Sequence, residues 1–168
     1  MSLSPRSASP CVASAMRAAT RRLTLLYDEV MAPSGLRVTQ FNILSELGRR
    51  DSDPPTVGEL AEILTTERSA LGQTLRPLER DGFIALGRDA RDGRRRPVQL
   101  TTAGRDAVAR ARPYWNEAHG RFARFFGDTA LAELRTTLRG IAESPRLADA
   151  FDLGSRGGEG VKPPRELG

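Results

Sequence analysis

The 168-residue sequence predicts a mainly α-helical fold with a small β wing, organised around a winged helix-turn-helix lobe. Three observations support this prediction. Apolar residues recur at steps of three or four over most of the chain, which is typical of amphipathic helices. Two short helices separated by a tight turn are expected between Thr56 and Gly82. Two short apolar segments follow, and the arginine-rich stretch between them indicates a β-hairpin with a charged tip.

Two further helices are expected before the helix-turn-helix. The first runs from Val12 to about Met31, and Pro33-Ser34-Gly35 then ends it. The second is short and runs from about Thr39 to Leu47, with Thr39 as the candidate N-cap residue. The polar stretch 48–55 is expected to be a loop.

The helix-turn-helix has its own start and stop signals. Thr56-Val57-Gly58-Glu59 has the S/T-x-x-E form of a capping box and starts the first of the two helices. The second helix ends at Gly82, a residue type common at helix C-termini. Pro77 removes the hydrogen bond to the carbonyl of Gln73, so a bend without a break is expected there. The apolar stripe of this helix consists of Leu71, Leu75 and Leu78.

The wing and the C-terminal helices follow. Residues 83–86 and 97–100 are expected to be strands joined by the charged segment 87–96. Thr101 or Thr102 can then cap a long helix that Pro113 could kink. A last helix is expected from Asp128, with an apolar stripe that a small winged helix does not need for itself, although packing within the chain is the alternative use. That stripe consists of Leu131, Leu134, Leu138 and Ile141.

Charge and rare residues restrict the function. The 26 basic and 21 acidic residues give a net charge of +5, which favours a polyanionic partner such as DNA. One cysteine and one histidine exclude an intramolecular disulfide and leave no zinc cluster, so no metal and no cofactor are expected. No apolar run approaches the roughly 18–20 residues that span a bilayer, so a cytoplasmic protein without a membrane contact is expected. The stretches 1–10 and 154–168 are expected to be disordered tails.

Several motifs together resemble one protein family. They are Glu67-Arg68-Ser69, the segment LRPLERDG at 75–82, the wing pattern D-x-R-D-x-R-x-R at 89–96, and L-T-x-x-G at 100–104. They resemble the DNA-binding lobe of MarR-family transcriptional regulators. The resemblance implies one domain, 11–153, with a DNA-binding lobe at about 38–102 and dimerisation helices at about 11–32 and 103–143. It also implies a homodimer that binds double-stranded DNA at a near-palindromic site.

The expected DNA-binding residues lie on two elements. Opposite its leucine stripe, the second helix carries small residues, an amide able to read adenine, and guanidinium groups for guanine or phosphate. By resemblance Arg94 would enter the minor groove, with Arg91 and Arg96 supporting it. The acidic residues of the wing suggest that Asp89 or Asp92 orients one of its arginines. The candidate DNA-binding residues are Thr66, Arg68, Ser69, Gln73, Arg76, Arg88, Arg91, Arg94, Arg95 and Arg96.

The sequence leaves two mechanisms open by which DNA binding could be regulated. The resemblance implies a small-molecule effector between the dimerisation helices and the DNA lobe, although the same aromatic residues could be core. One branch of the family senses peroxide through a cysteine near the start of its first helix, where Cys11 stands here with Tyr27 as its tyrosine partner. The match is incomplete, because that cysteine would align nearer position 13 and a second tyrosine with Val38. The candidate effector residues are Tyr114, Trp115, His119 and Phe122.

The sequence therefore predicts a sequence-specific DNA-binding transcriptional regulator, a dimeric repressor released by an effector or by oxidation of Cys11. A winged-helix protein-interaction module that does not bind DNA is the alternative, and it predicts no arginine on the recognition face or wing. An enzyme with Cys11 as nucleophile and His119 as base is a third reading. It lacks a phosphate loop, a paired carboxylate motif and a nucleophile elbow, so no enzymatic activity is expected.

Overall fold

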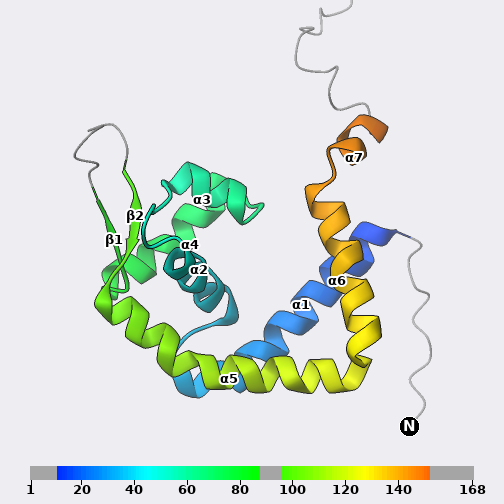
Figure 1. Ribbon diagram of the computed structural model, residues 1–168, viewed down its shortest axis with the longest axis horizontal. Coiled ribbons are helices and arrows are strands. Elements are labelled where there is room, and N and C mark those ends of the chain that lie inside the picture. Colours follow the sequence, from blue (N-terminus) through cyan, green and yellow to red (C-terminus); the bar gives the residue numbers. More distant parts are fainter. Residues whose placement is uncertain (1–10, 88–95, 152–168) are drawn as a thin grey trace, which may run out of the picture. The chain divides into compact units, whose positions relative to one another are not determined.

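Figure 1 shows the computed structural model of the protein, which describes residues 11–87 and 96–151. The two expected tails and the tip of the wing, with Arg88, Arg91, Arg94 and Arg95, lie outside these ranges. The chain divides after Phe125 into two compact units, each of which is described by itself.

The elements follow the predicted order. In the first unit they are α1 (Val12–Met31), the 3₁₀ turn η1 (Ala32–Ser34), α2 (Val38–Arg49), α3 (Val57–Ile63), α4 (Arg68–Arg80), β1 (Ile84–Leu86), β2 (Val98–Leu100) and α5 (Thr102–Phe126). The second unit holds α6 (Asp128–Glu143) and α7 (Pro145–Ala150). The predicted fold class, mainly α with a small β wing, is confirmed. The prediction that the helix from Asp128 is the last one was wrong, because α7 follows an extended Ser144 with proline at its first position.

The start of α2 corrects another expectation. Thr39 lies inside the helix, and Arg37 is the N-cap residue. The backbone N–H of Val38 donates to Asp28 Oδ1 of α1 at 2.7 Å, and the N–H of Arg37 donates to Gln40 Oε1 at 3.0 Å. An acceptor from another helix therefore replaces the local threonine cap.

The helix-turn-helix forms where its signals predict. Thr56 Oγ1 accepts from the N–H of Glu59 at 3.3 Å, and a carboxylate oxygen of Glu59 accepts from the N–H of Thr56 at 2.6 Å. The capping box is thus complete on both sides. Helix α4 runs unbroken through Pro77. It ends at Arg80, two residues before the expected Gly82, whose φ of +75° is the left-handed backbone that glycine tolerates best.

The wing and α5 are joined by Thr101. Strands β1 and β2 pair antiparallel, with Ile84 opposite Leu100 and Leu86 opposite Val98. Thr101 Oγ1 accepts from the N–H of Gly104 at 3.0 Å, so Thr101 caps α5 and Thr102 begins it. Helix α5 then runs through Pro113 without a break.

One core holds the first unit together. Strand β1 packs beside α4 and β2 beside α2, while α3 packs on α4 (Figure 1). Trp115 of α5 and Tyr27 of α1 pack against this core. None of the described helices has the length and apolar character that crossing a membrane requires. The largest fully buried side chains are Phe41, Met31, Leu44, Leu47, Leu60, Leu78 and Val98.

Candidate nucleic-acid interface

Helix α4 has two chemically different faces. Leu71, Leu75 and Leu78 are buried, with exposed fractions of 3%, 5% and 0%. The opposite face exposes polar side chains, as the leucine spacing predicts for an amphipathic helix. This outward face, called the recognition face below, consists of Ser69, Gln73 and Arg76 together with the partly exposed Gly72. Arg68 is exposed at the first residue of α4.

The turn before α4 is unusually tight. Thr65 has a φ of +49°, the left-handed conformation that is rare for a β-branched residue. Its neighbour Thr66, an exposed candidate residue, donates its N–H to the carbonyl of Ala61 at 2.9 Å. The N–H of Thr65 donates to the carbonyl of Glu62 at 3.0 Å. These two bonds fix the direction in which α4 leaves α3.

The base of the wing holds one of the predicted arginines. Arg96 is exposed and comes directly before Pro97, which forms an isolated bridge with Thr56. The N–H of Gly87 donates to the carbonyl of Pro97 at 2.8 Å, so the hairpin is closed at this point. Arg96 therefore extends from a fixed position beside the helix-turn-helix.

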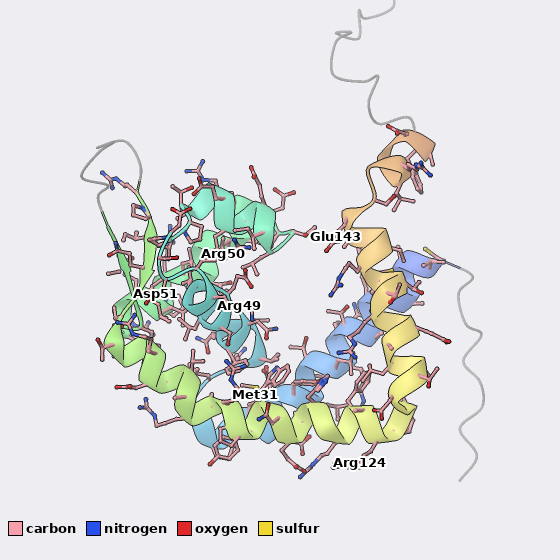
Figure 2. The ribbon with its side chains drawn as sticks, in the orientation of Figure 1. Met31, Arg49, Arg50, Asp51, Arg124 and Glu143 are labelled. Carbon is pink, nitrogen blue, oxygen red and sulfur yellow. The ribbon has the colours of Figure 1, made fainter. Side chains whose placement is uncertain are left out.

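Three arginines near the end of α2 and the start of α5, none of them a candidate DNA-binding residue, have structural partners. Arg50 Nε donates to Glu46 at 2.8 Å, and Arg49 bonds the same carboxylate. Burial favours a raised pKa for Glu46, but the hydrogen bonds and charges of the two arginines outweigh it and lower that pKa. Arg105 of α5 donates to Asp51 at 3.2 Å and to the carbonyl of Leu100 at 3.0 Å. Figure 2 labels Arg49, Arg50 and Asp51, where α2 ends.

Two of the four candidate effector residues, Trp115 and His119, lie together in the structure. The ring of Trp115 stacks on Phe41 with centroids 5.8 Å apart and on His119 with centroids 4.9 Å apart. Tyr27 Oη lies 3.2 Å from His119 Nδ1, and burial raises the pKa of this tyrosine. Phe41, Trp115, His119 and Tyr27 thus form an aromatic cluster that ties α1, α2 and α5 together.

The other two candidates lie at the surface or near it. Tyr114 has an exposed fraction of 37%, and Phe122 is half-buried. Arg112 places its guanidinium 4.8 Å from the centre of the Phe41 ring. Trp115 and His119 are therefore the candidate effector residues that the structure brings together.

The redox candidates do not meet within one chain. Cys11 and Tyr27 lie sixteen positions apart on the unbroken α1 and its N-cap, a separation of about 24 Å along a helix. The hydroxyl of Tyr27 instead faces His119. Cys11 is exposed at the N-terminus of α1. Hydrogen bonds from the backbone of Ser14, its side chain and the backbone of Ala13 lower the pKa of the thiol.

A helix-turn-helix with an arginine-bearing outer face, followed by a two-stranded hairpin, defines a winged helix-turn-helix protein. The model of the MarR family matches residues 34–95, which include α2, the helix-turn-helix and β1. The chain belongs to the MarR family of transcriptional regulators.

The similar known proteins match different shares of this chain. The transcriptional activatory protein BadR of Rhodopseudomonas palustris is 35% identical over 95 residues, and the match spans about half of each protein, 53% of this chain and 54% of BadR. The M. tuberculosis regulator MosR, solved in complex with DNA, is 30% identical with a TM-score of 0.72, covering 84% of this chain and 98% of MosR. The transcriptional repressor CouR, solved on a 23-mer DNA duplex, is 27% identical with a TM-score of 0.71, covering 85% and 100%.

Proposed function

We propose that the protein is a sequence-specific regulator of transcription that binds double-stranded DNA as a homodimer and has no enzymatic activity. The observation that carries this proposal is the recognition face of α4, which exposes Gln73 and Arg76 opposite a buried leucine stripe, with Arg68 exposed at the start of the helix. Such a helix fits the major groove, where guanidinium and amide groups read base edges. Similarity to MosR and CouR, both solved with DNA, supports the same use of the fold.

The wing supplies the second contact of the proposal. Arg96 is exposed at its base, beside the helix-turn-helix. Arg88, Arg91, Arg94 and Arg95 lie outside the described residues but belong to the same charged segment of the sequence. Phosphate contacts of this kind position a protein on the duplex and make its affinity depend on salt.

Homodimerisation is part of the proposal because the apolar surface of α1 exceeds what one chain covers. Met31 is the buried residue of α1, whereas Val12 and Leu25 keep exposed fractions of 66% and 64%. In the second unit, Leu138 and Ile141 of α6 keep 40% and 38%. Leu138 and Ile141 lie three positions apart on one face of α6, and an uncovered apolar face supports contact with another molecule. We assign residues 38–102 to DNA binding and the helices in 11–32 and 103–143 to the dimer.

We propose that the protein represses transcription and that a small-molecule effector releases it from DNA. We also propose that it acts in the cytoplasm. Oxidation of Cys11 is a second candidate, favoured by an exposed thiol of lowered pKa at a helix N-terminus. For this second switch, peroxide should release wild-type protein from DNA and leave the Cys11→Ser variant bound. Equal release of both would exclude Cys11 as the sensor.

Selection of bound sequences from random duplexes tests the DNA-binding function directly. We expect a near-palindromic site with half-sites about one helical turn apart. On this site, Arg68→Ala should weaken binding and reduce the slope of log K against log salt by about 0.9. Arg121→Ala, which removes an exposed arginine from α5, is the matched control and should keep the slope. Absence of any duplex binding in dilute salt would favour the protein-interaction module instead.

A further inference from the structure

The recognition face includes a helical glycine that the fold of the chain does not require. A Cβ atom built at Gly72 meets no atom of the described residues within 4 Å. Glycine in a helix interior destabilises the helix relative to alanine. Gly72 differs from other open helical positions in lying on the recognition face, where the absent side chain leaves the helix backbone open to close approach by an outside molecule.

Beside Gly72, two side chains of the same face are bonded to each other. Arg76 Nη1 donates to Gln73 Oε1 at 3.3 Å. A guanidinium carries donors and no acceptor, so this bond must engage the amide oxygen. The N–H groups of the Gln73 amide and the remaining N–H groups of Arg76 are left for a ligand. The pair therefore offers hydrogen-bond donors.

We propose that Ser69, Gly72, Gln73 and Arg76 form a site that reads guanine in the major groove. Positions 69, 72, 73 and 76 have the i, i+3, i+4, i+7 spacing of one helix face. The inference rests on the proposed DNA-binding function and adds the base that this surface prefers. Gly72 brings the helix backbone close to the base edges, and Arg76 fixes the orientation of the Gln73 amide.

The hydrogen bond between the two side chains favours guanine over adenine. Guanine presents two acceptors in the major groove, N7 and O6, whereas adenine presents the N7 acceptor and the N6 amino donor. To read adenine, Gln73 Oε1 would have to accept from N6, but Arg76 already occupies one of the two lone pairs of this oxygen, so the pair presents more donors than acceptors. Donors from both side chains match the two acceptors of guanine. This differs from the adenine reading that the amide suggests when it is considered alone.

The first test is selection of bound duplexes by the wild type and by variants of the pair. The wild type should enrich guanine at one position in each half-site, and Gln73→Ala and Arg76→Ala should each relax that preference, by roughly 5- to 150-fold. Gln73→Glu, which carries acceptors alone, should move the preference to cytosine, whose N4 amino group donates. Adenine at this position, or guanine unaffected by all three variants, overturns the inference. Binding without any sequence enrichment, or no binding, overturns the proposed function as well.

The second test uses two helical glycines with equally open surroundings. A Cβ at Gly140 of α6 also meets nothing within 4 Å of the described residues. Gly72→Ala and Gly140→Ala should both raise the thermal unfolding midpoint. Gly72→Ala should weaken binding to the selected duplex by about ten-fold or more, whereas Gly140→Ala, which lies on the side of α6 away from the Leu138 and Ile141 stripe, should keep wild-type affinity. Unchanged affinity of a folded Gly72→Ala protein overturns the close approach.

Discussion

Gly104 illustrates how one residue joins the wing to the helix that follows it. A Cβ atom at this position would lie 2.1 Å from the carbonyl oxygen of Phe83 and 2.7 Å from Leu100 Cδ1. The backbone of Phe83 cannot retreat easily, because its carbonyl also accepts the N–H of Thr101 at 3.1 Å. The first turn of α5 therefore lies directly on the start of the hairpin, and this contact requires glycine.

We expect Gly104→Ala to lower the free energy of unfolding by at least about 2 kcal/mol, because overpacking forces the backbone to move. Urea unfolding followed by circular dichroism measures this loss. Gly140→Ala, at an open helical position, should instead raise the free energy of unfolding by about 0.5–1 kcal/mol. Equal stability of the two variants would contradict the close contact at Gly104.

The sequence could not supply the reason for this glycine. The L-T-x-x-G motif places Gly104 three residues after Thr101, and the threonine cap follows from that local pattern. The contact with Phe83 joins residues that lie 21 positions apart, so no local pattern contains it. The polar residues of the recognition face were predictable from the leucine spacing, but the bond between Gln73 and Arg76 depends on side-chain conformations.

At the scale of elements, the turn between α3 and α4 and the end of α4 use the same backbone geometry with different residues. Thr65 has a φ of +49° after α3, and Gly82 has a φ of +75° after α4. Left-handed backbone costs an L-residue roughly 1–2 kcal/mol, which glycine avoids. The turn that sets the direction of the recognition helix is therefore the strained one of the two.

Thr65→Gly should raise the free energy of unfolding by about 0.5–1 kcal/mol, the relief of strain less the added entropy of the unfolded chain. The reverse exchange, Gly82→Thr, should lower the free energy of unfolding by a similar or larger amount. Thermal and urea unfolding of both variants measure the two effects. A loss of stability in Thr65→Gly would mean that the threonine side chain stabilises the turn more than its backbone strains it.

Helices were predictable from the sequence where local signals define them. Periodic apolar residues gave the bounds of α1, and Thr56 and Glu59 gave the start of α3, because each signal lies within a few positions. The N-cap at Thr39 was wrong, since the acceptor at α2 is Asp28, ten residues away on α1. Tertiary capping of this kind leaves no mark in the local sequence.

At the scale of the whole molecule, the apolar stripe of α6 bears on whether the protein is a monomer or a dimer. Spacing predicted the stripe of α6, and the structure shows that it changes along the helix: Leu131 is 4% exposed, whereas Leu138 and Ile141 are 40% and 38% exposed. Sequence spacing establishes that such a stripe exists but not what covers it, because a covered face and an uncovered face have the same periodicity.

The homodimer proposal predicts that charge on the stripe separates the two chains. The Leu138→Arg/Ile141→Arg variant should sediment at the mass of one chain, 18.3 kDa, because burying guanidinium groups without partners is strongly unfavourable. Its affinity for the selected duplex should fall by about 10²- to 10⁴-fold, since the two recognition helices no longer bind as one unit. Ala132→Arg adds charge to an exposed position on the opposite side of α6 and should keep both the dimer and the affinity. Sedimentation equilibrium and duplex titration measure the two properties, and a double variant that stays dimeric would exclude this stripe from the interface.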